Sequence, residues 1–287
     1  MTGGAEMSFF SIITATKNAS AVLPRLLSSL AVQTYRDFNL IVQDAKSTDS
    51  SHEIIESFRP QLPILLDISS DSGIYDAWNK ALVLHKKNLG KWIIFLGADD
   101  QLAGTQVLQS VAGKLTNSSH MHYAAGSVQY TDSNGALLNS YFNPDVKNFS
   151  KIIPYRMPLI NSALFHHQSQ LITYPFDTRF HIAGDYDQIV RAWESSSKCI
   201  ELDMVVSYMA LGGVSTGPKH ADSAYEEMCY VRKKYFFVQK YFVIPLEKID
   251  KALERSGHKS TLRSVMTSNK YVLCIWNLLR RIKRKIL

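Results

Sequence analysis

The 287-residue sequence predicts an α/β fold, with a mostly parallel sheet, helices on both faces and a C-terminal helical extension. Strand-like and helix-like segments alternate through the first half of the chain, and four of the strand-like segments end in polar clusters. The composition, 46% hydrophobic and 20% charged, is that of a globular protein. The length is sufficient for one large core and a smaller appended region.

In the first half, apolar runs of strand length alternate with segments whose apolar residues recur at helical spacing. The strands are predicted at 9–15, 38–42, 64–68 and 91–96. The helices are predicted at 21–32, 50–58, 75–87 and 106–115. This alternation is typical of parallel strands joined by helical crossovers.

The second half has a different pattern. Two short strand-like runs flank Asn134-Gly135, a dipeptide typical of hairpin turns. A loop, a helix and a strand are then predicted at 143–158, 185–194 and 200–210. Because the pattern is helical from residue 221 onward, we divide the chain into a main α/β domain at 7–220 and a C-terminal helical, basic region at 221–287.

The formal net charge of +7 is concentrated at the C-terminus, where residues 270–287 hold six Lys/Arg and no acidic residue. The remaining body is nearly neutral, so no nucleic-acid partner is expected. The uncharged run before Arg280 is shorter than the roughly 20 residues of a spanning helix. We expect residues 270–287 to lie on an anionic membrane surface, with Trp276 at the headgroup boundary. The alternative is a C-terminal helical subdomain whose apolar residues pack on the body or on another subunit.

The three cysteines, Cys199, Cys229 and Cys274, are widely spaced and match neither a metal-ligand motif nor an even disulfide framework. This pattern favours a reducing compartment. Together with the basic tail, it predicts a cytoplasmic protein that is peripheral on the inner face of the plasma membrane.

Polar residues follow each of the four predicted strands. They are Thr14-Ala15-Thr16, Asp44, Asp71 and Asp99-Asp100. Because parallel strands end at one edge of a sheet, these clusters should converge on one cleft. Each cluster alone is also explained by a turn or a helix N-cap. Two adjacent carboxylates at the end of a buried strand, however, call for a cation or a hydrogen-bonded ligand.

Six segments of the chain resemble glycosyltransferase family 2, whose members have the GT-A (Rossmann-like) fold. These segments are SIITATKN, QDAKSTDSS, DSGIYDAWNKAL, KWIIFLGADD, AGDYDQIVRAW and GGVS. DSGIYDAWNK is similar to the DKGIYDAMNK signature of bacterial polysaccharide-assembly members. The resemblance covers roughly residues 7–215.

The resemblance implies roles for individual residues. Thr14, Ala15 and Thr16 would lie along the base and ribose of a nucleotide-sugar donor, and Asp44 would face the base, although Ala45 stands where many members have a second Asp. Asp99 would contact the ribose, and Asp100 would ligate the Mg²⁺ or Mn²⁺ that bridges the donor diphosphate. Asp185 matches the catalytic base.

Further residues are assigned to the same cleft. Asp71 is placed on the donor side, as are Asp76 and Asn79, which lie one turn apart on a predicted helix. His167 and Gln168 are expected near the donor phosphate or the acceptor hydroxyls. Asp187 is the other candidate base, but we expect it to cap the helix or to pair with a cation.

The resulting expectation is a metal-dependent, inverting hexosyltransferase that acts on a nucleotide sugar, with UDP-hexose as the expected donor. Its acceptor would be a polyprenyl-diphosphate-linked or other glycan in O-antigen, capsule or exopolysaccharide synthesis. Two alternatives are a sugar-phosphate nucleotidyltransferase and a non-catalytic, membrane-tethered nucleotide-sugar-binding module.

Overall fold

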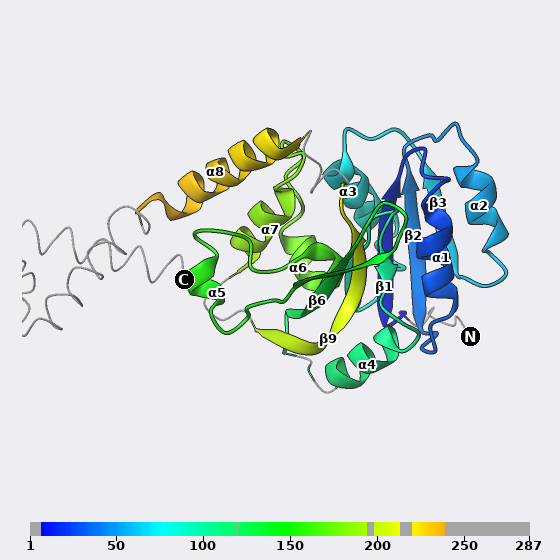
Figure 1. The fold of residues 1–287 in the computed structure, drawn as a ribbon, viewed down its shortest axis with the longest axis horizontal. Helices are drawn as coiled ribbons and strands as arrows, with labels where there is room; N and C mark the ends of the chain where they lie inside the picture. The colour runs from blue at the N-terminus through cyan, green and yellow to red at the C-terminus, as the bar shows by residue number, and fades with distance from the viewer. Residues whose placement is uncertain (1–6, 117, 119, 194–197, 213–219, 239–287) are drawn as a thin grey trace, which may run out of the picture.

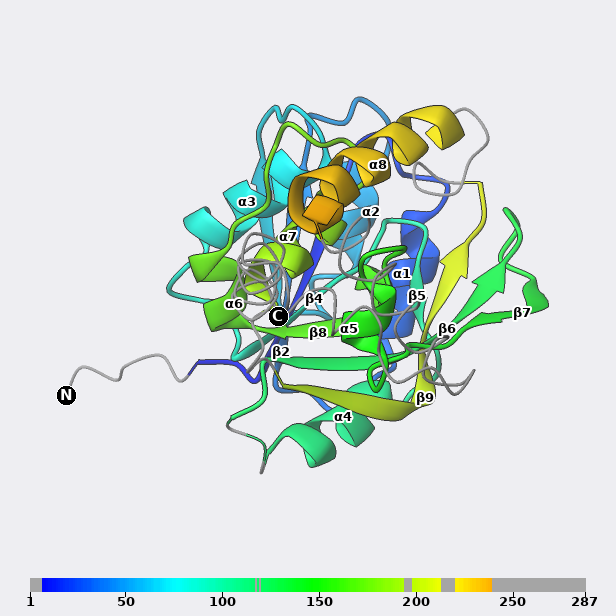
Figure 2. The same ribbon diagram turned by 90° about the vertical axis from the view of Figure 1, so that its left-hand side faces the viewer.

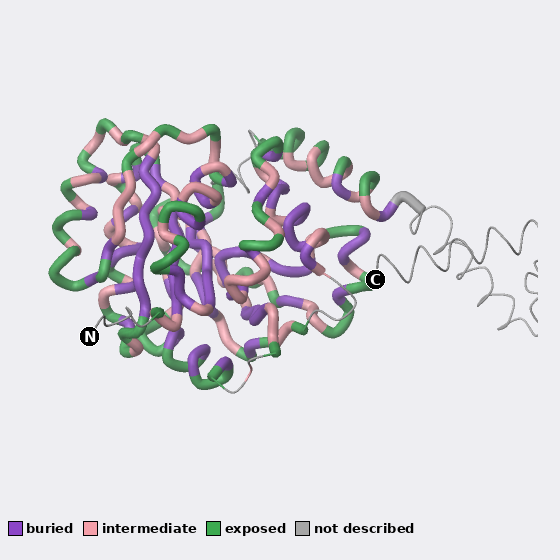
Figure 3. The backbone as a smooth tube through the Cα atoms, turned by 180° about the vertical axis from the view of Figure 1, so that it is seen from behind, coloured by how far each residue is buried: buried purple, intermediate pink, exposed green. Residues whose placement is uncertain are grey.

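A computed structural model describes residues 7–116, 118, 120–193, 198–212 and 220–238. Within these residues, a nine-stranded sheet has the order β3-β2-β1-β4-β8-β6-β9-β5, and β7 pairs with β6. Helices lie on both sides of this sheet (Figure 1), and the strands form a buried layer between more exposed helices and loops (Figure 3). The predicted fold class is confirmed.

The first half of the described chain forms the parallel part of the sheet. Its strands are β1 (Phe10–Thr16), β2 (Phe38–Asp44), β3 (Ile64–Ile68) and β4 (Trp92–Phe95). They are connected by α1 (Leu23–Ala31), α2 (Ser51–Ser57) and α3 (Ile74–Leu84). All three pairings among these strands are parallel. The carboxyl ends of these strands therefore share one edge, as predicted.

Beyond β4 the sheet is mixed. The strands here are β5 (Gln101–Leu102), β6 (Tyr123–Thr131), β7 (Leu137–Phe142), β8 (Leu164–His167) and β9 (Cys199–Ala210). Strand β8 is antiparallel to both β4 and β6, and only the β6–β9 pair is parallel in this half. The reversed direction of β8 brings its amino end, rather than its carboxyl end, to the edge where β4 ends.

Two hydrophobic cores lie on the two faces of the sheet. Because side chains alternate along a strand, Ile12 belongs to the core under α1 and Ile13 to the core under α3. The remaining helices are α4 (Val107–Leu115), α5 (Phe149–Ile152), η1 (Asn161–Ala163), α6 (Gln168–Thr173), α7 (Gly184–Ala192) and α8 (Ala221–Val238). Buried side chains of α4 join the first core, and those of α6, α7 and α8 join the second.

Helix α8 packs against α7, away from α2 (Figure 1), and Figure 2 shows α8 running obliquely in front of α7. Val231 and Phe236 of α8 are buried. Within the described part of the chain, no helix is both long enough and apolar enough to span a membrane. The basic tail at 270–287 lies outside the described residues, and the proposed domain boundary at residue 220 stays a prediction.

Candidate active site

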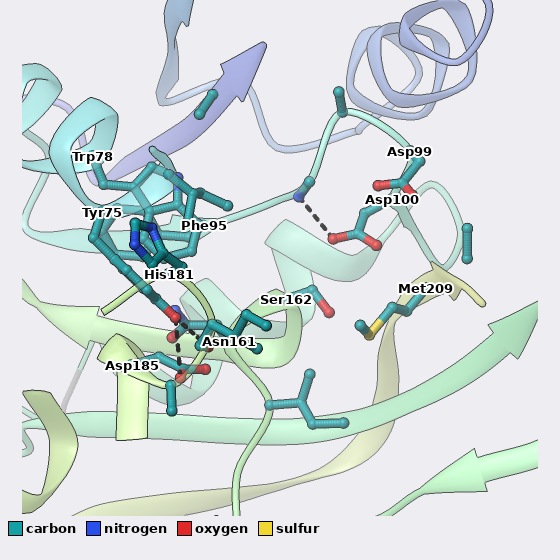
Figure 4. Close-up of a pocket in the computed structure, with 18 of the residues that line it drawn as sticks. Tyr75, Trp78, Phe95, Asp99, Asp100, Asn161, Ser162, His181, Asp185 and Met209 are labelled. Atoms are coloured by element: carbon teal, nitrogen blue, oxygen red, sulfur yellow. Dashed lines mark hydrogen bonds between the residues drawn. The ribbon is translucent and has the colours of Figure 1, made fainter. Parts of the chain in front are cut away.

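A cavity of about 650 Å³ opens at the carboxyl edge of the parallel strands. Its walls come from the turn after β1, the loop after β4, the segment entering β8, the loop before α7, and α8. Asp99, Asp100 and Asp185 all line it. Figure 4 shows Asp99 and Asp100 on one side of this cavity and Asp185, beside Tyr75, on the other. The structure therefore brings together three carboxylates that the sequence predicts to share a pocket.

Asp100 is a buried carboxylate with only 6% of its surface exposed. Its Oδ2 accepts a hydrogen bond from the Gly97 backbone N–H at 2.8 Å. Burial, followed by the neighbouring charge of Asp99, raises the pKa of Asp100 to about 8. A bound cation would reverse both effects, because it favours the ionised carboxylate.

The surroundings of this pair fit a hard divalent cation. No ion pair to Asp99 or Asp100 and no group of three metal-ligating side chains is found in the described ranges. Mg²⁺ typically uses one or two protein carboxylates and takes its other oxygens from substrate phosphates and water. Structural zinc sites instead use four nitrogen or sulfur ligands. Asp99 and Asp100 therefore suit a cation that a diphosphate helps to hold.

Asp185 lies in the first turn of α7 and is partly buried. Its Oδ1 accepts a hydrogen bond from the Tyr186 backbone N–H at 2.7 Å and lies 3.4 Å from the Tyr75 hydroxyl. Burial raises the pKa of Asp185 to about 6, and the hydrogen bonds from Tyr186 and Tyr75 oppose the shift. The group is thus ionised at neutral pH yet basic enough to accept a proton, which suits a general base.

Tyr75 anchors α3 to the segment before α7. Its hydroxyl donates to the Ile182 carbonyl at 2.5 Å, and its ring stacks on Phe176 with centroids 5.4 Å apart. Gly184 lies against this ring, and an added Cβ would be only 2.6 Å from the ring carbon Cε2. The absence of a side chain at Gly184 therefore allows Asp185 to lie next to Tyr75.

Gly184→Ala is expected to destabilise the protein by about 1–3 kcal/mol, because the buried Tyr75 ring is held by its hydrogen bond and by Phe176. Gly113→Ala in α4 is the matched control, since nothing lies within 4 Å of its added Cβ. That change should stabilise the helix by about 0.5–1 kcal/mol. Urea unfolding measures both, and equal stability of the two variants would contradict the prediction.

Asp187 serves a structural purpose. Its carboxylate is fully buried and contacts Arg191 Nε at 2.6 Å, Tyr235 Oη at 2.9 Å and Lys234 Nζ at 3.3 Å. These contacts tie α7 to α8. The expectation that Asp187 pairs with a cation is confirmed.

Of the predicted base-side residues, only Ala15 lines the cavity. The Asp44 carboxylate is buried and is bonded by Thr16 Oγ1, by Ser47 N and Oγ, and by His52 Nε2, at 2.6 to 2.8 Å. These hydrogen bonds lower the pKa of Asp44 although burial alone would raise it. Thr14, Thr16 and Asp44 do not line this cavity, and four contacts hold the Asp44 carboxylate. Their assignment to the donor stays a prediction.

The residues expected from α3 are also occupied elsewhere. Asn79 bonds the backbone of Phe176 with both its amide nitrogen (2.8 Å) and its amide oxygen (3.0 Å). Asp76 accepts from Lys80 Nζ and Ser72 N, both at 2.8 Å, and Asp71 accepts from Gly73 N at 3.1 Å. None of Asp71, Asp76 and Asn79 lines the cavity. Asp71 and Asp76 bind backbone N–H groups at the start of α3, and Asn79 ties the middle of this helix to Phe176. Their assignment to the donor site stays a prediction.

His167 and Gln168 lie at the opposite edge of the sheet. Because β8 is antiparallel to β4, His167 pairs with Trp92, the first residue of β4. The Gln168 backbone N–H bonds the Lys91 carbonyl at 3.0 Å. The assignment of these two residues to the phosphate or acceptor side is therefore wrong.

The short helix η1, directly before β8, places two unpredicted residues in the cavity wall, Asn161 and Ser162. Asn161 is 8% exposed, and its Oδ1 lies 3.1 Å from His166 Nε2. Within the described part of the chain its amide nitrogen is buried and has no hydrogen-bond partner. Because β8 is antiparallel to β4, the residues just before β8 lie at the edge where the cavity opens. The sequence alone gives no signal for this strand direction, and so Asn161 was missed.

Solved structures of glycosyltransferases share this fold. S. aureus TarS 1-349 in complex with UDP aligns with a TM-score of 0.59 and 20% identity, covering 78% of this chain and 64% of that chain. The mannosyltransferase PcManGT from Pyrobaculum calidifontis, in complex with GDP-Man and Mn²⁺, aligns with a TM-score of 0.53 and 18% identity over 82% of this chain and 64% of that one. At these identities the likeness establishes the fold.

Sequence relatives agree with the fold. A "PGL/p-HBAD biosynthesis glycosyltransferase" of Mycobacterium bovis is 30% identical over 211 residues, 72% of this chain and 78% of the relative. An Escherichia coli protein named "UDP-Glc:alpha-D-GlcNAc-diphosphoundecaprenol beta-1,3-glucosyltransferase WfaP" is 26% identical over 149 residues, 52% of this chain and 57% of that protein. The model of the family "Glycosyl transferase family 2" matches residues 11–170. The chain therefore belongs to glycosyltransferase family 2, and it is a glycosyltransferase with the GT-A fold.

Proposed function

We propose that this chain is a metal-dependent, inverting hexosyltransferase that moves a sugar from a UDP-hexose to a lipid-linked glycan. The observation that carries the proposal is the cavity with Asp99 and Asp100 on one side and Asp185 on the other. A single displacement needs a base on the acceptor side and stabilisation of the leaving group on the donor side. Asp185 would supply the base on one side of this cavity, and Asp99 and Asp100 would stabilise the leaving group on the other.

In the proposed reaction, an acceptor hydroxyl oxygen forms a bond to the anomeric carbon, and the bond from that carbon to the diphosphate oxygen breaks. Asp185 accepts the proton of the hydroxyl, and the single displacement inverts the anomeric configuration. Asp99 binds the donor ribose, and Asp100 would hold Mg²⁺ or Mn²⁺. When bound, such an ion stabilises the negative charge of the departing nucleoside diphosphate.

The names of related proteins support the choice of substrates. WfaP is named for a UDP-Glc donor and a diphosphoundecaprenol-linked acceptor, and TarS was solved with UDP and with UDP-GlcNAc. We extend this to a UDP-hexose donor and to an acceptor in bacterial surface polysaccharide or glycolipid synthesis. An acceptor on a lipid carrier lies at a membrane.

We also propose that the enzyme works peripherally on the inner face of the plasma membrane. The support is the cluster of six Lys/Arg without an acidic residue at 270–287. Each basic residue near an anionic surface contributes about 1 kcal/mol of attraction. Flotation of the full chain with anionic and with neutral vesicles measures this attraction.

A thermal-shift screen of nucleotide sugars tests the proposed donor. A ligand that binds only the folded state raises the free energy of unfolding, by about 2.7 kcal/mol when its concentration is one hundred times its Kd. The melting temperature rises accordingly. We expect UDP-hexoses to stabilise the protein with Mn²⁺ or Mg²⁺ and to do so far less with a chelator. Stabilisation that is equal in chelator would contradict the metal dependence, and stabilisation by GDP-sugars alone would contradict the UDP donor.

A further inference from the structure

One side chain of α8 holds the backbone that leads into α7. Glu227 Oε1 accepts a hydrogen bond from the His181 backbone N–H, and Oε2 accepts from the N–H groups of Ile182 and Ala183, all at 2.8 Å. The first N–H groups of a helix have no partner within the helix and attract negative charge. Helix α7 has no side-chain cap of its own at Ala183. Glu227 therefore binds the backbone that leads into α7, including the N–H of Ala183, the residue just before the first helical one.

The held segment continues directly into the proposed catalytic base. Its Ile182 carbonyl accepts the Tyr75 hydroxyl, which lies 3.4 Å from Asp185 Oδ1. Gly184 leaves no gap between this segment and the Tyr75 ring. A displacement of residues 181–183 would thus move Tyr75 or Asp185, because this segment contacts the Tyr75 side chain directly and continues into Asp185.

Helix α8 also forms part of the cavity wall. Ala224 and Met228, which lie one turn before and one residue after Glu227, line the cavity. The helix is fixed at a second point, where Lys234 and Tyr235 contact Asp187 of α7. Glu227 is therefore held at a defined position relative to the site.

We propose that Glu227 is a positioning residue for the transfer reaction: its carboxylate fixes residues 181–183 so that Asp185 faces the reacting carbon. This inference rests on the proposed role of Asp185. Glu227 lies beyond the residues 11–170 that match the family model, so it adds to the site a residue from the C-terminal part of the chain. A carboxylate suits this task because its two oxygens accept from three donors, and charge-assisted hydrogen bonds are about twice as strong as neutral ones.

The test compares three variants of the full chain. Glu227→Gln replaces one carboxylate oxygen by an amide N–H₂ group, which cannot accept a hydrogen bond from a backbone N–H. Glu227→Asp keeps the charge on a shorter side chain. Glu226→Gln is the matched control, since it removes the same charge from an exposed neighbour. We expect kcat to fall by about 10²-fold in Glu227→Gln, with partial recovery in Glu227→Asp and no change in Glu226→Gln, because a shift of about 1 Å in a reacting group costs this much.

Donor binding and hydrogen exchange separate positioning from general damage. We expect the Kd for UDP with Mn²⁺ to change by less than about twofold in Glu227→Gln, because Glu227 bonds residues 181–183, and His181 lies across the cavity from Asp99 and Asp100 (Figure 4). The amides of residues 181–183 should exchange faster in this variant, and amides of β1 should not. Unchanged kcat, or equal losses in kcat and UDP affinity, would overturn the proposal.

The exchange measurement needs no turnover. If the wild-type chain transfers no sugar, the proposed function fails, while the hydrogen bonds from residues 181–183 to Glu227 are still tested by exchange. If Glu227→Gln does not fold, Glu227→Asp carries the test. A Glu227→Asp variant with wild-type kcat and unchanged exchange at residues 181–183 would then overturn the proposal.

Discussion

Asp185→Asn is expected to lower kcat by about 10²- to 10⁴-fold, the usual contribution of a positioned general base. The amide has nearly the same shape as the carboxylate and can still accept the Tyr186 N–H at its oxygen, but it cannot take the acceptor proton. Nucleotide-sugar affinity should be retained, because Asp99 and Asp100 lie across the cavity. Steady-state kinetics with a saturating donor, together with a binding measurement, check both parts.

Asp203→Asn is the matched control, since Asp203 is exposed on β9 and the change removes the same charge. It should leave kcat unaltered. A kcat for Asp185→Asn within about threefold of the wild-type value would remove Asp185 from the mechanism, since general bases contribute far more. A wild-type chain that binds donor without any turnover would instead indicate a binding module.

The pH profile provides an independent check on Asp185. Because burial raises its pKa to about 6, the carboxylate is ionised above this pH and protonated below it. The base form is the active one, so kcat at saturating donor and metal should fall as pH decreases through about 6. The titrating and charged groups near it are the Tyr75 hydroxyl and the Glu227 carboxylate. Asp185→Asn should abolish this limb of the profile.

Asp100→Asn is expected to lower kcat/KM by about 10²-fold or more and to remove the effect of Mg²⁺ or Mn²⁺ on donor binding. Stabilisation of a leaving group by a metal is worth several kcal/mol, and each 1.4 kcal/mol is tenfold in rate. Titration of the nucleotide sugar with and without a chelator measures the metal effect. Asp203→Asn again serves as the control.

The same variant should be at least as stable as the wild type in the absence of metal. The ionised form of Asp100 is disfavoured by burial and by the charge of Asp99, and an amide relieves both while still accepting the Gly97 N–H. Thermal unfolding in chelator measures this. A large loss of stability together with unchanged activity would show that Asp100 is structural.

The parallel half of the sheet was predictable because its signals are local. Apolar runs such as 91–96 and the helical spacing in 21–32 lie within a few residues of one another, and the strand-end rule then placed Asp99 and Asp100 correctly. Helical spacing and the family resemblance likewise placed Asp185 at the start of α7. The periodicity of apolar residues shows which face of a strand or helix is buried. It is therefore sufficient to predict the fold where elements adjacent in sequence also pack side by side.

The sequence did not reveal contacts whose partner lies far away in the chain, nor which groups donate hydrogen bonds to a carboxylate. The direction of β8 depends on its pairing with β4, some seventy residues earlier, and this direction decides whether His167 or Asn161 reaches the cavity. Asp44 is at the strand end as predicted, but Ser47, three residues later, takes its carboxylate in the manner of an Asx turn. Among the described residues Glu227 is hydrogen-bonded by three backbone N–H groups, and these leave no side-chain signature in the sequence.

The reversal of β8 and the position of α8 have a consequence for how such enzymes diversify. In the proposed reaction the leaving group would be held by the loop after β4, whereas the acceptor would meet Asp185 and side chains from residue 157 onward, together with Tyr75. Largely separate stretches of polypeptide would then bind the two substrates. Substitutions in the later stretch could then change the acceptor specificity while the donor specificity stays the same.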